Sequence, residues 1–295
     1  MLQSFAPAKI NLYLHVTGRR EDGYHYLDSL VTFASVGDRV TLEEADQFSF
    51  VLDGPMAAAL KKADQSKNLV VQAAYALSDM LGRPLDFKLT LTKHLPVASG
   101  IGGGSSDAAA ALRLIAAHVG MAPDAPMLHK VAASLGQDVP CCLAATSCYF
   151  EGVGDQTSPA PSLPHMDIVL VNPRKSVSTP AIFKAREGGF SKPAERLSKS
   201  PATLEELVAH IAPMSNDLMA PAMALCPPIR AVMENLEAQE GCLLARMSGS
   251  GATCFGLFRD RGAARQAMAH IHKVHPEWWV VQGCGFSSEQ DLVRL

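Results

Sequence analysis

Hydrophobic and polar residues alternate along several short segments of the chain, and the first of these is residues 9–16. Every second residue from Ile10 to Val16 is apolar, and a period of two predicts a β-strand with one buried face. The same alternation places Lys9 and Asn11 together on the other face. Similar patterns predict strands near residues 27–34, 39–43, 48–52, 87–91, 149–150, 167–172, 243–247, 253–258 and 278–282.

Helices are predicted between these strands from their start and stop residues. Asn68 is a candidate N-cap for a helix that ends at Leu81, because Gly82 follows. The alanine- and leucine-rich stretch 107–119 predicts a second helix, and Gly136 ends a third over residues 126–135. Further helices are predicted over residues 203–211, 228–237 and 263–272. Strands and helices interleave without strict regularity, which favours the α+β class.

The chain of 295 residues is long enough for two domains. The stretch Thr157–Pro164 contains three prolines and two serines, so it is the best candidate for a junction. We therefore predict one domain over residues 1–160 and another over residues 161–295.

Charge and cysteine usage narrow the classes of function. A formal net charge of −3 shows no basic excess, which disfavours a nucleic-acid partner. The apolar stretch 108–119 is interrupted by Arg113 and His118, so no membrane-spanning helix is predicted. Seven cysteines without C-x-x-C spacing favour reduced thiols in a cytoplasmic protein over a zinc ribbon. No signal peptide is expected, since the first residues already read as a strand.

The segment Pro96–Asp107 holds four glycines and three serines between a predicted strand and a predicted helix. Glycines let the backbone approach a ligand closely, and a helix N-terminus offers free amides, so the segment predicts a phosphate site. It fits neither a Walker A loop nor a Rossmann fingerprint. The alternative is a flexible turn whose serines cap the helix. The predicted phosphate-binding residues are Pro96, Val97, Ala98, Ser99, Gly100, Ile101, Gly102, Gly103, Gly104, Ser105 and Ser106.

A second glycine-rich turn and two charged residues complete the candidate chemistry. The turn Met247–Thr253 lies between two predicted strands and is either a hairpin turn or a second backbone cradle facing the first. Phosphoryl transfer to a hydroxyl group needs a base and a nearby positive charge, which Asp138 and Lys9 can supply. The alternatives are a capping aspartate before Pro140 and a solvated lysine on a strand.

Taken together, these motifs resemble the GHMP kinases. Pro7–Asn11, Pro96–Ser106 and Ser248–Ala252 occur in the order found in that family. The resemblance implies a two-domain fold with the active site in the cleft between the domains. It also implies ATP and Mg²⁺ as cofactors and an alcohol as the phosphoryl acceptor. By matching position, Asp138 would be the base and Lys9 its charged neighbour.

One branch of this family matches along the whole chain, through Asp22–His25, Gly136–Pro140, Glu151–Gly154 and Thr179–Phe183. That branch phosphorylates the 2-hydroxyl of a methylerythritol carried on a cytidyl diphosphate, a step of the non-mevalonate isoprenoid pathway. The resemblance implies a small-molecule cytidyl diphosphate substrate and leaves monomer or homodimer open. The implied substrate residues are Asn11, Tyr24, His25, Thr179 and Phe183, with Tyr24 and Phe183 as the stacking pair.

The sequence departs from the family pattern at Asp107, where members often carry Asn. An acidic residue at a helix start favours the helix dipole, so we expect Asp107 to cap the helix rather than to bind a metal. No metal ligand is assigned, since Mg²⁺ is held mainly by substrate phosphates. Residues 284–291 match poorly, and no role is carried over to them.

Three hypotheses therefore remain at this point. The chain is a cytidyl-substrate kinase, another member of the family such as a homoserine or mevalonate kinase, or a non-catalytic nucleotide-binding protein. Tyr24, His25 and Phe183 favour the first, because a substrate without cytosine needs no stacking set. Tyr24 and Phe183 could instead be core aromatics, and His25 an exposed loop histidine. Lys9 and Asp138 argue against the third, because a binding protein needs no base.

Overall fold

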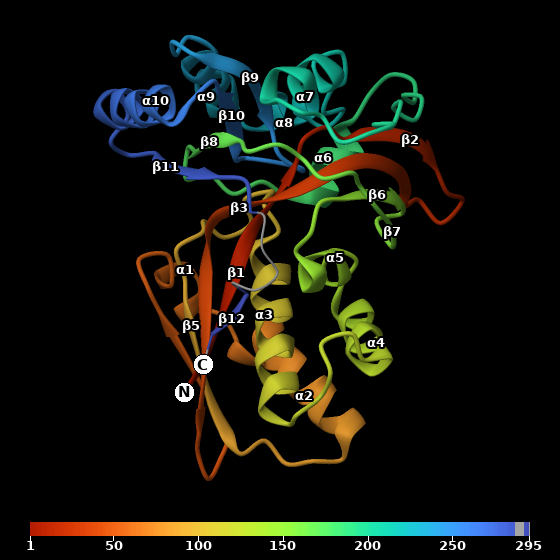
Figure 1. The fold of residues 1–295 in the computed structure, drawn as a ribbon, viewed down its shortest axis with the longest axis vertical. Helices are drawn as coiled ribbons and strands as arrows, with labels where there is room; N and C mark the ends of the chain where they lie inside the picture. The colour runs from red at the N-terminus through yellow and green to blue at the C-terminus, as the bar shows by residue number, and fades with distance from the viewer. Residues whose placement is uncertain (287–291, 295) are drawn as a thin grey trace.

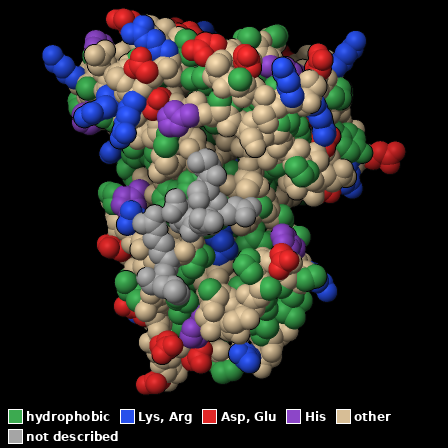
Figure 2. Space-filling view, in the orientation of Figure 1, with side chains coloured by type: hydrophobic (Ala, Val, Ile, Leu, Met, Phe, Trp, Pro, Cys, Tyr) green, Lys and Arg blue, Asp and Glu red, His purple; other side chains and the backbone are tan. Residues whose placement is uncertain are grey.

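The structure, a computed structural model, describes residues 1–286 and 292–294. Two β-sheets, each covered by helices, lie one above the other (Figure 1). The space-filling outline narrows between them (Figure 2). Among the described residues, no helix has the length and apolar character needed to cross a membrane.

The first sheet is built around β3 (His25–Glu44), a strand of 20 residues. Its main path runs in the order β12-β1-β3-β5-β4, and only β4 and β5 pair in parallel. Strands β2 and β6 pair with β3, and β7 pairs with β6. The bounds are β1 Leu2–Asn11, β2 His15–Arg19, β4 Ser49–Asp53, β5 Phe87–Thr92, β6 Cys148–Gly152, β7 Gln156–Pro159 and β12 Val293–Arg294.

Helices α2 (Leu69–Leu81), α3 (Gly103–His118), α4 (Pro126–Leu135) and α5 (Val139–Ala144) cover this sheet on one side (Figure 1). The predicted caps of α2 are confirmed, because Asn68 Oδ1 accepts from the Val70 amide and Gly82 is left-handed. Two short helices, α1 (Ala58–Lys61) and η1 (Gln65–Lys67), precede α2. Helix α3 is buried from Ser106 to Ala116, so it forms the centre of this domain.

The second sheet has the order β11-β8-β10-β9 and is antiparallel throughout. Its central strand β8 is apolar and fully buried, as expected for a strand covered on both faces. The strands are β8 Asp167–Asn172, β9 Cys242–Met247, β10 Cys254–Phe258 and β11 Trp279–Cys284. The helices are α6 Thr179–Ala185, α7 Leu204–Ile211, α8 Met219–Leu225, α9 Pro228–Glu237 and α10 Arg261–Val274.

A continuous apolar core joins the two domains. Ile10 from β1 and Ile101 from the glycine-rich segment pack in one cluster with Phe255 from β10. Leu14 and Val16, early in the sequence, belong to the core of the second sheet. Because residues of both domains pack in this shared core, the two domains are fixed relative to each other.

Three predictions about elements were wrong or incomplete. The strand predicted over residues 9–16 is two strands, because the amide of Leu14 bonds to the carbonyl of Ser215 in the other domain. The strands predicted at 27–34 and 39–43 form the single strand β3, with an irregular register opposite Pro7 and Ala8. Helices α5, α6 and α8 were missed, since segments of six or seven residues give too few turns to show a period.

Candidate active site

A cavity of about 580 Å³ opens between the two domains. Its walls in the first domain come from β1, the glycine-rich segment, Asp138 and Phe150. The second domain contributes Val177, Thr179, Phe183, Leu218, Gly249 and Ser250. The cavity therefore collects residues from segments far apart in the chain.

The glycine-rich segment forms the floor of this cavity and starts α3. Gly102 has a φ of 62°, and a Cβ there would lie 3.0 Å from the Cβ of Lys9, so only glycine fits. The first bond of the helix runs from the Ser106 amide to the Gly102 carbonyl at 2.9 Å. The amides of the first turn, Gly103–Ser105, consequently have no acceptor within the helix and can bind an anion.

Nine of the eleven predicted phosphate-binding residues line the cavity, and Ile101 and Ser106 do not. Ile101 is fully buried in the shared core, and its carbonyl accepts from the Lys9 amide at 2.9 Å. The Ser106 hydroxyl donates to the Pro7 carbonyl at 2.6 Å and is also fully buried. These two side chains anchor α3 to β1 and do not face the cavity.

The second glycine-rich turn contacts the first. The Ser248 hydroxyl donates to the Gly100 carbonyl at 3.1 Å, and the Thr253 amide donates to the Ser99 carbonyl at 3.1 Å. A Cβ at Gly100 would lie 2.5 Å from the Ser248 carbonyl oxygen, so the approach requires glycine. The segment is thus a turn between β9 and β10 that packs against the first glycine-rich segment, and its role as a second backbone cradle stays a prediction.

Lys9 and Asp138, 129 residues apart, form an ion pair at 2.7 Å between Nζ and Oδ1. The Lys9 residue is only 4% exposed, which excludes a solvated lysine. Burial alone would lower the pKa of Lys9, but the charge of Asp138 and neighbouring thiols outweigh it and raise the pKa. Asp138 precedes α5 without capping it, and about a third of its side chain is exposed. Its carboxylate can thus meet both Lys9 and a ligand.

The structure groups only some of the predicted substrate residues. Asn11, Thr179 and Phe183 line the cavity, whereas Tyr24 and His25 do not. The rings of His25 and Phe183 stack with centroids 4.9 Å apart. Partial burial, Arg19 and Arg186 lower the pKa of His25, which favours its neutral form.

Tyr24 is 58% exposed on the turn after β2, so it is not a core aromatic. Asn11 is instead 2% exposed and donates from Nδ2 to the Ser29 hydroxyl at 2.8 Å. The Thr179 hydroxyl bonds to that of Ser250 at 2.7 Å, so it ties α6 to the second glycine-rich turn. Asn11 and Thr179 are held in place by the protein, while Tyr24 is not.

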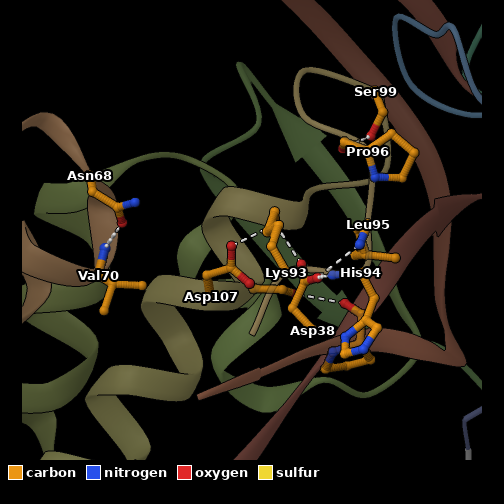
Figure 3. Close-up of polar contacts among 11 residues, drawn as sticks. Asp38, Asn68, Val70, Lys93, His94, Leu95, Pro96, Ser99 and Asp107 are labelled. Carbon is orange, nitrogen blue, oxygen red and sulfur yellow. Dashed lines mark hydrogen bonds and ion pairs between the residues drawn. The ribbon is translucent and has the colours of Figure 1, made fainter. Parts of the chain in front are cut away.

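The prediction that Asp107 caps a helix was wrong, because α3 begins one turn earlier, at Gly103. Asp107 is 2% exposed and its Oδ2 accepts from Lys93 Nζ at 2.7 Å. The same ammonium group donates to Asp38 Oδ2 at 2.5 Å (Figure 3). Asp38 also accepts from the amides of His94 and Leu95, which lie directly before the glycine-rich segment. The buried set of Asp38, Lys93 and Asp107 therefore anchors both ends of that segment.

Several cavity residues were not found from the sequence. Leu60, Lys67, Asn68 and Leu69 line one end of the cavity, next to the start of α2. Their only signal was the predicted cap at Asn68, which marks a helix start and carries no information about a ligand. Lys93 gave no signal either, because its partner Asp38 is 55 residues away in the sequence.

Arg113 connects the elements that carry Lys9, the glycine-rich segment and Asp138. From α3 its guanidinium donates to the carbonyls of Cys142 and Leu143 in α5, at 2.9 and 3.1 Å. It also donates to the Phe5 carbonyl of β1 at 2.8 Å. Burial lowers the pKa of Arg113 to about 10, and no carboxylate is among its partners. The last carbonyls of α5 provide the compensating negative potential.

Among the described residues, no group of three or more His, Cys, Asp or Glu side chains could hold a metal ion. The cavity thus has the free amides of the α3 start on its floor, the Lys9–Asp138 ion pair in one wall and the Phe183 ring, stacked on His25, in the wall of the second domain.

Sequence comparison decides the family. The GHMP kinases N terminal domain matches residues 68–146, and the GHMP kinases C terminal domain matches residues 199–277. The chain belongs to the GHMP kinase family. Membership implies ATP as the phosphoryl donor, and it confirms the predicted α+β, two-domain kinase fold with its active site in the cleft.

Individual relatives of this GHMP kinase agree. It is 49% identical to a 4-diphosphocytidyl-2-C-methyl-D-erythritol kinase of Rhodospirillum rubrum, over 93% of this chain and 89% of that protein. It is 51% identical to the protein of the same name from Cereibacter sphaeroides, over 95% and 98% of the two chains.

Solved structures of two kinases superpose on this chain. The crystal structure of a 4-(cytidine 5'-diphospho)-2C-methyl-D-erythritol kinase superposes with a TM-score of 0.79 at 30% identity, over 97% of this chain and 100% of that chain. A homoserine kinase from Cytophaga hutchinsonii superposes with a TM-score of 0.66 at 16% identity, over 99% and 96% of the two chains. At that identity the second match supports the fold alone.

Proposed function

We propose that this GHMP kinase transfers the γ-phosphoryl group of ATP to the 2-hydroxyl of 4-diphosphocytidyl-2-C-methyl-D-erythritol. The relatives named above carry that activity in their names and match nearly the whole chain. The observation that carries the proposal is the Lys9–Asp138 pair at 2.7 Å, beside the free amides at the start of α3. The product would enter the non-mevalonate route to isoprenoid precursors.

In this mechanism Asp138 accepts the proton of the acceptor hydroxyl as the oxygen attacks the γ-phosphorus. The bond between that phosphorus and the bridging oxygen to the β-phosphate breaks, and ADP leaves. Lys9 pairs with the Asp138 carboxylate and offers positive charge to the developing alkoxide. The amides of Gly103–Ser105 hold the phosphates, so charge is stabilised mainly by preorganised donors. Mg²⁺ would enter with ATP as the substrate complex and shield its phosphate charge.

The cytidine would bind on the aromatic side of the cavity. Phe183 lines the cavity with His25 stacked on its ring, and such flat faces suit a cytosine. Tyr24 remains a prediction as the second stacking ring, with its exposed side chain next to His25 in the chain. Asn11 and Thr179, which line the cavity, remain predicted substrate contacts.

The direct test measures ADP formation with Mg–ATP and each candidate alcohol. We expect turnover with the cytidyl substrate and none above background with homoserine or mevalonate. The Asp138→Asn protein, assayed in parallel, shows whether any ADP comes from the site itself. Absence of turnover with the cytidyl substrate at saturating Mg–ATP would reject the assignment.

We also propose the domain bounds, the location in the cell, the oligomeric state and the partners of the enzyme. The first domain covers residues 1–160 and the second 161–295. Across this boundary, Leu14 and Val16 pack in the core of the second sheet, and β12 pairs with β1 of the first sheet. The enzyme works in the cytoplasm as a monomer or homodimer, on a small molecule and without nucleic acid. Light scattering at several concentrations distinguishes the two oligomeric states.

A further inference from the structure

The buried set beneath the cavity floor contains one more negative charge than positive. Asp38, Lys93 and Asp107 are 0, 2 and 2% exposed, and one ammonium group bridges both carboxylates. Lys93 and Asp107 also line the cavity. Two carboxylates held at one site inside a protein do not both ionise easily, since each disfavours the charge of the other. One of them is therefore expected to hold a proton.

Hydrogen bonding indicates which of the two it is. Asp38 accepts from Lys93 and from the amides of His94 and Leu95, so its acceptor sites are matched by donors. Within residues 1–286 and 292–294, Asp107 accepts only from Lys93, through Oδ2, and its buried Oδ1 has no partner. An ionised oxygen without a donor is costly in the interior, whereas a protonated oxygen can donate to a ligand.

We propose that Asp107 is a neutral carboxylic acid with its proton on Oδ1. At a pH at which the free protein has lost this proton, nucleotide binding is accompanied by uptake of a proton at Asp107. The inference rests on the proposed function, because it places the nucleotide phosphates at the start of α3. Lys93 Nζ would lie 3.1 Å from a Cβ on Gly103, so the set lies directly behind the first turn of that helix. Burial raises the pKa of Asp107 well above its usual range, and the Asp38 charge adds to it although Lys93 opposes it.

The sign of the effect follows from charge. A bound polyphosphate near Asp107 disfavours its ionised form, so the pKa of Asp107 is higher in the complex than in the free protein. Below the pKa of the free protein the affinity for nucleotide does not depend on this group. Above it the affinity falls by up to about tenfold per pH unit, until the pKa of the complex is reached.

Other charged or titratable groups around α3 are few. Lys9 of β1, Asp138 before α5, and Cys141 and Cys142 within α5 lie on the neighbouring elements. Among the remaining packed elements, β3 also carries the buried Asp28, the half-buried His25 and Glu43, and the exposed Arg39. The titratable groups of the two neighbouring helices are exposed: Tyr75 and Asp79 of α2, and His129 and Lys130 of α4. A variant at position 107 leaves all of these in place, so it separates their titration from that of Asp107.

The test is isothermal titration calorimetry with a non-hydrolysable ATP analogue, from about pH 6 to about pH 9 and in buffers of different ionisation enthalpy. As pH rises, the number of protons that wild type takes up per bound nucleotide should exceed that of Asp107→Asn by an amount that approaches one. The Asp107→Asn side chain has the shape of a neutral carboxyl group, and its amide can place the NH₂ donor at either of the two carboxyl oxygen positions. Its affinity for the nucleotide should therefore match the low-pH affinity of wild type. Equal proton uptake by both proteins would overturn the proposal.

A second measurement does not depend on nucleotide or on a stable variant. Infrared spectroscopy of the free protein should show the carbonyl stretch of a buried carboxylic acid, which disappears as pH rises. Its absence at all pH values would overturn the inference while leaving the kinase assignment intact. An increased Mg²⁺ requirement of Asp107→Asn would also overturn it, because it would show that Asp107 acts as an ionised metal ligand. Conversely, no turnover with the cytidyl substrate despite proton-linked nucleotide binding would reject only the proposed acceptor.

Discussion

The two sides of the cavity differ in how firmly their residues are held. On the donor side, Lys9, Lys93 and Asp107 are each at most 4% exposed, and every one is tied to another element by an ion pair. On the acceptor side, Phe183 is half-buried and Tyr24 is 58% exposed. The donor side is thus formed before any ligand binds, whereas the acceptor side keeps side chains that can still rearrange. A kinase built this way would hold one nucleotide in a fixed position and complete its second site around the alcohol.

The largest effect that tests this comparison should come from Asp138→Asn. The amide cannot accept the proton of the hydroxyl, so kcat should fall on the order of 10²–10⁴-fold. Nucleotide affinity should change little, because the phosphates are held by backbone amides. Single-turnover kinetics and nucleotide titration measure the two quantities. Asp124→Asn, an exposed aspartate, is the control, and a near-wild-type kcat for Asp138→Asn would remove Asp138 as the base.

The next effect concerns the rigidity of the donor side. Arg113→Met removes the group that links α3, α5 and β1 and leaves buried carbonyls without donors, which should cost about 2–4 kcal/mol in the free energy of unfolding. Urea denaturation measures this loss. Arg39→Met, at an exposed position, should stay within about 0.5 kcal/mol of wild type. Equal stability of the two variants would mean that Arg113 is not a structural link.

On the acceptor side, Phe183→Ala should weaken binding of the cytidyl substrate by about 1–3 kcal/mol through lost stacking. Nucleotide affinity should remain at the wild-type value, since Phe183 lies across the cavity in the other domain. Calorimetry with each ligand separates the two. Phe190→Ala removes an exposed phenylalanine of the same domain and serves as the control. Parallel losses for both ligands would show that the sides of the cavity are not independent.

The smallest effect is expected for Tyr24→Ala. Its ring lies outside the cavity in the free protein, so the turn must order before the ring can stack, and ordering offsets part of the gain. We expect a loss of about 1 kcal/mol in substrate affinity, at the lower end of the range for base stacking. Tyr26→Ala, on the same hairpin and 44% exposed, is the matched control. An unchanged substrate Kd for Tyr24→Ala would leave Phe183 and His25 as the whole aromatic site.

Features encoded by neighbouring residues could be predicted from the sequence. Helix α2 has its cap at Asn68 and its stop at Gly82, and the structure confirms both. The start of α3 was placed too late because glycine and serine are poor helix formers, and here tertiary contacts override that preference. The bond from Ser106 to Pro7, 99 residues away, is one such contact.

The site was predictable to a similar extent. The glycine-rich segment was singled out by its residue types, whereas Lys9 and Asp138 were assigned through the resemblance to the GHMP kinases. The contacts between these residues could not be predicted, since the Lys9–Asp138 pair joins residues that are 129 apart in the sequence. Asp107 was singled out only as a departure from the family pattern, and Asp38 and Lys93 gave no local signal, because burial alone makes those common residues unusual.

The pairing of β12 with β1 has a consequence for synthesis of the protein. Gln3 and Ser4 pair with Arg294 and Val293, so residues near the two ends of the chain form one edge of the first sheet. During translation the start of β1 stays unpaired on that side until Val293 and Arg294 leave the ribosome. Such distant pairings form slowly, and an open strand edge invites pairing with other chains. The emerging kinase therefore carries an open edge, at which it can aggregate, until β12 is released, and a chaperone would help it most during that interval.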